Sequence, residues 1–132
     1  MAIDYGEKRI GIALSDPLST FAYPYTTIQN SSSLISDLSK IIAEKNIVKV
    51  ILGQPSLIFK SSLKISEKVQ KLRAEIETKL KVEVLLWDEE YSSIIAKEKV
   101  IESVTKKSKR KDKGLVDKQA AAIILQEYLD SK

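Results

Sequence analysis

The chain opens with Ala2-Ile3-Asp4-Tyr5-Gly6-Glu7-Lys8-Arg9-Ile10-Gly11-Ile12-Ala13-Leu14-Ser15-Asp16-Pro17, a stretch that predicts two strands joined by a tight turn. Ile10, Ile12 and Leu14 alternate with small or polar residues, which is the period of a half-buried strand. Gly6 allows the backbone to turn sharply, because glycine has no Cβ. We take this strand-turn-strand unit as the element around which the rest of the chain is organised.

Charged residues surround the predicted turn. Asp4 stands where the first apolar strand ends, and the cations Lys8 and Arg9 follow within five residues. An acid at the edge of a core, beside a glycine and two cations, is an arrangement expected for metal and phosphate chemistry. The alternative is a charged hairpin turn, because aspartate and glycine also favour turns.

Composition limits the chemistry that the chain can perform. It has 132 residues, a net charge of +4, and neither cysteine nor histidine. One domain over residues 1–132 is expected at this length. Disulfides, thiol nucleophiles, imidazole bases and ordinary zinc sites are excluded. The longest apolar run, Ala120 to Leu125, is far below the roughly 18 residues of a membrane span. We expect a soluble cytoplasmic protein without a secretion signal or membrane partner.

The remaining elements alternate between strands and helices. A third strand over 20–28 contains Pro24, which places it at a sheet edge or at a bulge. Its aromatic residues Phe21, Tyr23 and Tyr25 belong either to the core or to an interface, and we assign them to the core. The following elements are a helix over 34–45, a strand over 48–52, a helix over 65–80, a strand over 82–87, a helix over 92–104, and a last helix from about Asp117. We predict an α/β fold with a mixed five-stranded sheet, in which an antiparallel three-strand meander is followed by two parallel strands. Helices are expected on both faces.

Acidic residues fall at three topological positions. Asp4 ends the first strand, Asp88 and Glu89 follow the last strand, and Asp117 lies near the start of the final helix. Sites in open α/β sheets form at the carboxyl ends of strands, so these acids are expected on one rim. Clustered carboxylates need cations, and Mg²⁺ prefers such oxygen ligands. Each acid has a structural alternative: a helix N-terminal acid at Asp117, and a solvated strand end at 88–90.

Asp16, before Pro17, is interpreted as turn chemistry.

A basic segment precedes Asp117. Residues 105–114 carry six cations and one acid. Such runs are usually solvated, but a cationic segment beside a metal site would contact phosphates and release counterions. The predicted nucleic-acid contacts are Lys8, Arg9, Lys106, Lys107, Lys109, Arg110, Lys111 and Lys113.

Four segments together resemble the YqgF/RuvX family, whose members are described as Holliday junction resolvases and as pre-16S ribosomal RNA nucleases. They are residues 4–17, Gly53-Gln54-Pro55, Asp88-Glu89-Glu90-Tyr91-Ser92-Ser93, and Val116-Asp117-Lys118-Gln119-Ala120-Ala121-Ala122. The resemblance implies an RNase H-like fold and catalytic, metal-binding acids at Asp4, Glu89 and Asp117, with Mg²⁺ or Mn²⁺. Asp88 remains the alternative ligand to Glu89. Glu90 replaces the family's arginine.

Several functions follow from these observations as expectations. The first is a hydrolase, a metal-dependent endonuclease that processes the 5′ end of precursor 16S rRNA in ribosome biogenesis. The alternatives are a Holliday junction resolvase and a non-catalytic, basic RNA- or ribosome-associated module. The expected partner is precursor rRNA or branched DNA, bound by a monomer or homodimer. The Asp-x-Gly opening also resembles the phosphate loop of sugar kinases and actin-like proteins, but 132 residues leave no room for their second domain.

Overall fold

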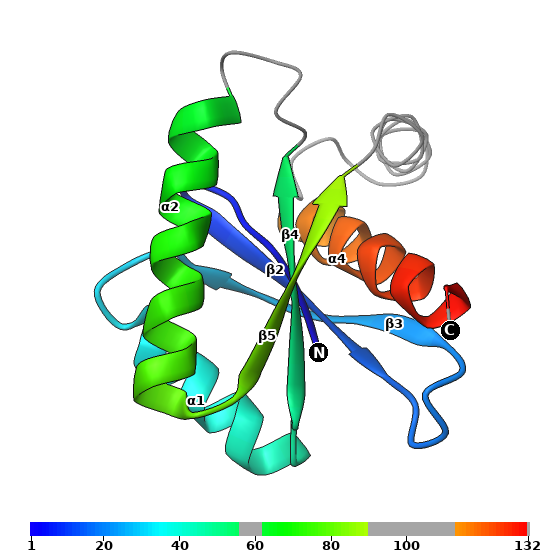
Figure 1. The fold of residues 1–132 in the computed structure, drawn as a ribbon. Coiled ribbons are helices and arrows are strands. Elements are labelled where there is room, and N and C mark those ends of the chain that lie inside the picture. Colours follow the sequence, from blue (N-terminus) through cyan, green and yellow to red (C-terminus); the bar gives the residue numbers. More distant parts are fainter. Residues whose placement is uncertain (56–61, 90–112, 132) are drawn as a thin grey trace.

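The computed structural model describes residues 1–55, 62–89 and 113–131. Its centre is a five-stranded sheet in the order β3-β2-β1-β4-β5 (Figure 1). The strands are β1 (Ala2–Asp4), β2 (Arg9–Ser15), β3 (Ala22–Gln29), β4 (Lys49–Pro55) and β5 (Glu83–Glu89). β1, β2 and β3 pair antiparallel, whereas β4 runs parallel to both β1 and β5. The predicted mixed sheet is therefore confirmed.

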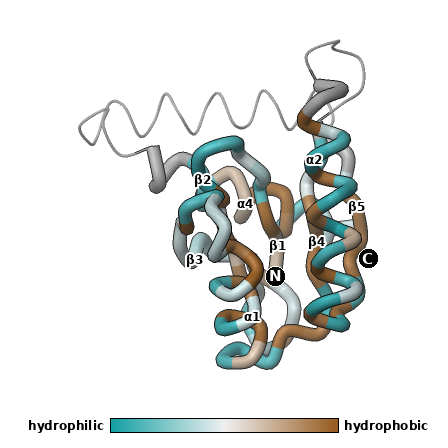
Figure 2. The backbone as a smooth tube through the Cα atoms, turned by 90° about the vertical axis from the view of Figure 1, so that its left-hand side faces the viewer, coloured by the Kyte–Doolittle hydropathy of each residue, from teal (hydrophilic) through white to brown (hydrophobic). Residues whose placement is uncertain are grey.

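Helices cover both faces of this sheet. The described helical elements are α1 (Leu34–Lys45), α2 (Ser62–Glu75), its continuation as a π-helical segment η1 (Ile76–Leu80), and α4 (Lys113–Asp130). α1 and α2 lie on one side of the sheet and α4 on the other (Figure 1). Hydrophobic and hydrophilic residues alternate along α1 and α2 in Figure 2, as expected for helices with one buried face. Among the described residues, no helix is both long and apolar enough to cross a membrane.

Two apolar layers hold the helices to the sheet. The layer beneath α1 and α2 is the larger and contains mostly isoleucine, leucine and valine. The layer beneath α4 contains several alanines, and larger side chains enter it mainly from α4. Successive strand residues point to opposite faces, so each strand contributes to both layers. The two layers thus differ in side-chain size, and this difference affects how closely each helix approaches the sheet.

Strand β3 behaves as its proline predicts. It is an edge strand, and its pairing with β2 shifts between Ile12 and Ala13, where Ile12 pairs with Thr26 and Ala13 with Pro24. The assignment of its aromatics to the core is wrong for Phe21, which is 67% exposed, and for Tyr23, which is 45% exposed. An edge strand has a partner on one side only; Phe21 directly precedes β3 and Tyr23 is its second residue. Tyr25 does pack against the larger layer.

The helix starts differ from the sequence prediction. α2 begins at Ser62 instead of Ile65, and α4 begins at Lys113, four residues before the expected start. Gly114 has a low intrinsic helix propensity, but it is the second residue of α4. The predicted helix over 92–104, and all of the basic segment before Lys113, lie outside the described residues.

Candidate active site

The strand register brings the carboxyl ends of β1, β4 and β5 to one rim. Asp4 of β1 pairs with Gly53 of β4, and Gly53 pairs with Trp87 of β5. Asp88 and Glu89 are the last two residues of β5. The sequence predicted that Asp4 and this acidic pair end parallel strands of one sheet, and the backbone confirms it, with β4 between the two strands.

Glycine at position 11 brings α4 against the sheet beside Asp4. Gly11 lies directly opposite Asp4 in the antiparallel pair, so the two positions share one face. A Cβ on Gly11 would overlap the backbone carbonyl of Asp117 and lie 2.9 Å from the backbone nitrogen of Lys118. The backbone of α4 therefore passes over this glycine, and Asp4 and Asp117 flank the same point of the sheet.

Sequence reasoning placed no role on Gly11. A glycine inside a strand often marks a close approach of another backbone. That is the signal by which the residue could have been found.

Asp117 is held by an arginine from β2. The Nε atom of Arg9 lies 3.1 Å from Oδ2 of Asp117, in an ion pair that joins residues 108 positions apart. The two side chains are 32% and 28% exposed. Asp117 is the fifth residue of α4, beyond the first turn, so its reading as a helix N-terminal acid is wrong. Arg9, predicted as a nucleic-acid contact, points to the acid in this structure.

The turn between β1 and β2 is fixed from outside. Asn30, just after β3, donates its side-chain amide to the Gly6 carbonyl at 2.8 Å and its backbone N–H to the Lys8 carbonyl at 3.0 Å. A Cβ on Gly6 would overlap the carbonyl of Arg9, which explains why this tight turn contains glycine. Glu7 pairs with Lys68 of α2 at 3.7 Å. Asn30 lies in no motif of the sequence and was missed.

The predicted cationic contacts are only partly within the described residues. Lys8 is exposed on the turn next to the rim. Lys113 is the first residue of α4. The other five cations of the basic segment, and the side chains of Asp88 and Glu89, lie outside the description.

The described part of the site contains two acidic side chains, those of Asp4 and Asp117. There, no three side chains of the metal-binding types form a group that could hold an ion. Asp4 and Asp117 nevertheless supply carboxylate oxygens, the donors that Mg²⁺ and Mn²⁺ prefer. A cation already stands at Asp117, in the form of the Arg9 guanidinium. The donor type of Asp4 and Asp117 thus fits a hard divalent ion, and in this structure Arg9 balances the charge of Asp117.

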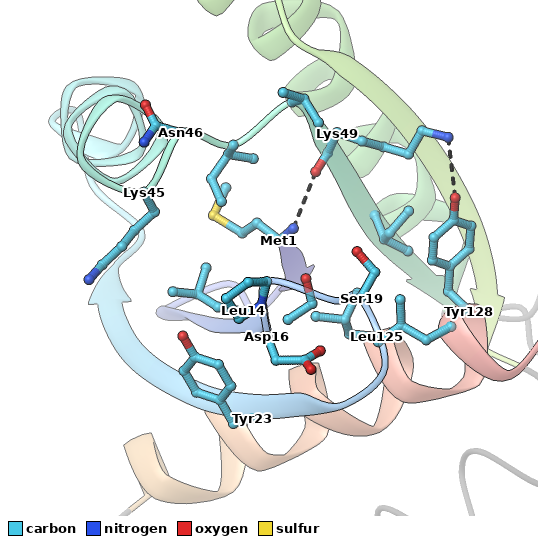
Figure 3. Close-up of a pocket in the computed structure, with 16 residues that line it drawn as sticks. Met1, Leu14, Asp16, Ser19, Tyr23, Lys45, Asn46, Lys49, Leu125 and Tyr128 are labelled. Atoms are coloured by element: carbon cyan, nitrogen blue, oxygen red, sulfur yellow. Dashed lines mark hydrogen bonds between the residues drawn. The ribbon is translucent and has the colours of Figure 1, made fainter.

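The hollow with a volume of about 680 Å³ lies elsewhere, beside the start of β1 and between the β2–β3 turn and the end of α4 (Figure 3). Among the described site residues, none lines it. Asp16 on its wall accepts hydrogen bonds from the backbone N–H groups of Thr20 at 2.6 Å and Phe21 at 2.9 Å. The bond from Phe21, followed by that from Thr20, lowers the pKa of Asp16. Its interpretation as a turn residue is confirmed.

Sequence comparison relates nearly the whole chain to known proteins. A family model described as "RuvX: Holliday junction resolvase" matches residues 1–131. Two bacterial relatives carry the curated name "Putative pre-16S rRNA nuclease". The protein of Caldicellulosiruptor saccharolyticus is 38% identical, over 98% of this chain and 95% of its own. That of Caldanaerobacter subterraneus subsp. tengcongensis is 37% identical, over 100% and 96%.

Solved structures of low sequence identity share the fold. The RuvC protein of T. thermophilus, solved with a Holliday junction substrate, has a TM-score of 0.58 and 14% identity, covering 98% of this chain and 91% of that one. The Fowlpox virus resolvase, solved with substrate Holliday junction DNA, has a TM-score of 0.50 and 14% identity, covering 98% and 95%. Both support the RNase H-like class of the predicted fold.

Proposed function

The chain belongs to the RuvX family, and from that membership we propose that it is a divalent-metal-dependent endonuclease that processes the 5′ end of precursor 16S rRNA. One observation carries the proposal. The backbone of Asp117 lies against Gly11, the residue opposite Asp4, so two acidic residues from opposite ends of the sequence flank one point of the carboxyl rim. Such a pair is the beginning of a metal site of the type that hydrolyses phosphodiesters.

Asp4, Asp117 and Glu89 are the residues proposed to hold Mg²⁺ or Mn²⁺. When bound, such ions activate a water molecule and stabilise the leaving oxygen of a phosphodiester. Strand periodicity favours Glu89 over Asp88 as the third ligand. Trp87 is on the α4 side, where it stacks edge-on against Tyr128 with ring centroids 5.7 Å apart. Because successive positions of a strand alternate between its two faces, position 89 belongs to the same face as position 87, and position 88 belongs to the other face.

The remaining residues of the rim bind and orient the substrate in this proposal. Lys8 lies on a turn in which Asn30 binds the carbonyls of Gly6 and Lys8. These hydrogen bonds fix the backbone that carries the Lys8 side chain. Lys8 and the basic segment contact the phosphates on either side of the cleaved bond. These contacts make binding sensitive to salt and carry no sequence information.

Precursor rRNA is preferred to a DNA junction because of the relatives. The proteins with 38% and 37% identity are named as rRNA nucleases, whereas the junction-bound structures share only 14% identity. Processing of this kind would take place in the cytoplasm. The family description favours the junction as the second candidate substrate, for which a homodimer would match the two-fold symmetry.

Cleavage by purified protein tests the proposal. Labelled precursor 16S rRNA 5′ ends and a four-way DNA junction are incubated with Mg²⁺, Mn²⁺ or chelator. We expect metal-dependent cuts in the RNA and their loss, by at least about 100-fold, in Asp4→Asn and Asp117→Asn.

Asp16→Asn is the matched control, because it removes an acid but keeps the oxygen that accepts from Thr20 and Phe21. It should cleave like the unaltered protein. Cuts confined to the four-way DNA junction would contradict rRNA processing and indicate resolvase activity instead. Salt-sensitive RNA binding without products would indicate the non-catalytic module.

A further inference from the structure

The ion pair between Arg9 and Asp117 connects a candidate metal ligand to a built-in cation. We propose that Arg9 is the counter-ion of Asp117 in the metal-free protein, and that it must release this carboxylate before a divalent cation can bind there. The inference rests on the proposed function, because it takes Asp117 as a metal ligand. It makes Arg9 a positioning residue that sets how tightly metal is bound.

The geometry of the pair supports this role. Arg9 begins β2 two residues before Gly11, so it shares the face on which α4 lies. Its Nε–H points at Oδ2 of Asp117 across 3.1 Å, and both side chains are about two-thirds buried. The guanidinium therefore occupies one of the two oxygens through which the Asp117 carboxylate could bind a metal ion. A divalent cation bound to Asp117 and the guanidinium of Arg9 would also repel each other, because both would lie beside the same carboxylate.

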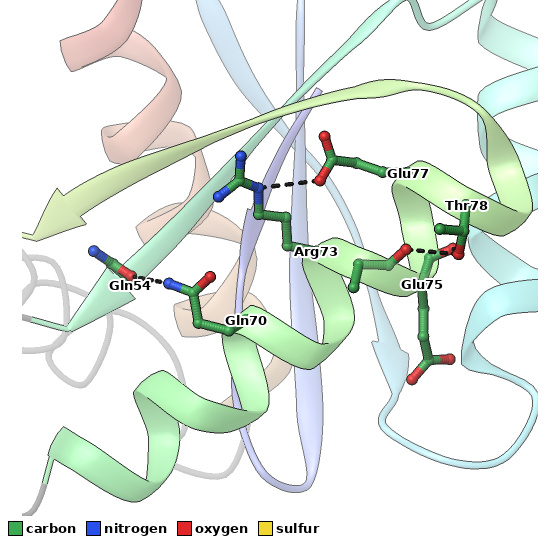
Figure 4. A network of polar contacts seen from close by, with 7 residues as sticks. Gln54, Gln70, Arg73, Glu75, Glu77 and Thr78 are labelled. Carbon is green, nitrogen blue, oxygen red and sulfur yellow. Dashed lines mark hydrogen bonds and ion pairs between the residues drawn. The ribbon is translucent and has the colours of Figure 1, made fainter.

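A second arginine provides an internal comparison. Arg73 of α2 pairs through its Nε with Oε1 of Glu77, also at 3.1 Å (Figure 4). That pair spans one helical turn, with side chains 40% and 41% exposed, and it lies away from the rim. The two pairs share their chemistry and distance but differ in place. An effect of added metal ions that is confined to Arg9 thus indicates binding at the site. An effect on both arginines indicates a general effect of the added salt.

The cost of release is expected to be modest. Ion pairs with this degree of exposure change an equilibrium constant by up to about fivefold, because water screens them and long side chains lose freedom in forming them. Removing the positive charge next to the site adds to this effect. Metal affinity should therefore rise about three- to tenfold when the competing guanidinium is absent, which is large enough to measure.

The first experiment observes the pair directly in the unaltered protein. The side-chain Nε–H signals of Arg9 and Arg73 are followed by ¹H–¹⁵N NMR in chelator and during a Mg²⁺ titration, with assignment by Arg9→Gln and Arg73→Gln. We expect the Arg9 signal to shift and to exchange faster with water as Mg²⁺ binds. The Arg73 signal should remain unchanged. An unchanged Arg9 signal at Mg²⁺ saturation would overturn the inference.

The second experiment measures Mn²⁺ affinity by calorimetry. Arg9→Gln should bind about three- to tenfold more tightly than the unaltered protein, and Arg73→Gln within twofold of it. Arg9→Lys keeps the positive charge but lacks the planar guanidinium, so its Mn²⁺ affinity should lie between those of the unaltered protein and Arg9→Gln. If Arg9→Gln does not fold, as judged by circular dichroism, Arg9→Lys, which also lacks the arginine Nε–H, assigns the NMR signal, and its Mn²⁺ affinity and the NMR titration decide.

The outcomes separate the two proposals. Equal or weaker Mn²⁺ binding by Arg9→Gln, with binding intact in the unaltered protein, would overturn the counter-ion role and leave the nuclease proposal standing. Absence of Mn²⁺ binding in every variant would contradict the metal site itself and, with it, both proposals.

Discussion

The two faces of the central strands β1 and β2 are built from different residues. The face toward α1 and α2 presents large aliphatic side chains, each at most 2% exposed: Ile3, Ile10, Ile12 and Leu14. The face toward α4 presents Ala2, Asp4, Gly11 and Ala13 at the alternate positions. One pair of strands thus fills a core with one face and carries the candidate site on the other.

The difference in size explains the difference in role. Large side chains hold a helix at a distance and fill the space between with apolar contacts, which stabilise the fold. Small side chains allow a helix backbone to approach, and at Gly11 that approach brings Asp117 to the sheet. We infer that substitutions on the first face chiefly change stability, and those on the second chiefly change activity. Four substitutions test this contrast.

Ile12→Ala should have the largest effect on stability. Its side chain is fully buried in the layer beneath α1 and α2. We expect a loss of about 2–5 kcal/mol in the free energy of unfolding, measured by urea denaturation. Cleavage per folded molecule should be unchanged. A selective loss of cleavage without destabilisation would break the comparison.

Gly11→Ala tests the neighbouring position on the other face. The added Cβ would overlap the Asp117 carbonyl, so α4 must shift away from the rim. We expect a destabilisation of about 1–3 kcal/mol from overpacking. Metal-dependent cleavage should fall at least about tenfold, since a small displacement of positioned groups is costly to catalysis. Full activity in the folded variant would show that the close approach is unnecessary.

Asn30→Ala sharpens the comparison at the turn between the two strands. It removes the 2.8 Å hydrogen bond to the Gly6 carbonyl. The expected loss of stability is about 1 kcal/mol. Cleavage should fall a few-fold, because the turn that carries Lys8 loses a support. Gln29→Ala, at the exposed preceding residue, is the control and should change neither property.

Asp16→Asn should have the smallest effect. The pKa of Asp16 lies below its ordinary value of 3.8, chiefly because the Phe21 N–H binds the carboxylate. A depressed pKa contributes stability that is present above the ordinary value and is lost as pH falls through the folded pKa. The small stability advantage over Asp16→Asn, from denaturation at several pH values, should be constant near neutrality, begin to decline as the pH approaches 3.8, and disappear only below the depressed pKa of the folded state. Cleavage should not differ.

Much of the architecture is predictable because it depends on local pattern. Alternation in 9–15 and the apolar runs near 50 and 85 indicate strands, and their separation by helical segments implies parallel pairing. The start of α4 is not predictable in this way. Gly114 lowers local helix propensity, and the buried residues Ala121, Ile124 and Leu125 mark only the part of α4 that packs on the sheet, whereas the helix begins at Lys113.

The candidate site is predictable in its acids but not in their surroundings. The ends of strands mark Asp4 and the acidic pair of β5, because topology alone places them on one rim. The pair between Arg9 and Asp117 joins residues 108 positions apart, so no sequence window contains it. Asn30 likewise acts on a turn 24 residues away.

The most direct test of the account is to locate bound Mn²⁺ by its paramagnetic broadening of backbone amide signals in ¹H–¹⁵N NMR spectra. We predict that sub-stoichiometric Mn²⁺ first broadens the amides around Asp4, Gly11, Gly53 and Asp117, and that Asp117→Asn weakens the effect. The amides of Asp16 and Ser19, at the opposite edge, should remain sharp. Broadening centred on the Asp16 turn, or none at the rim, would contradict a metal site on the sheet face that carries α4.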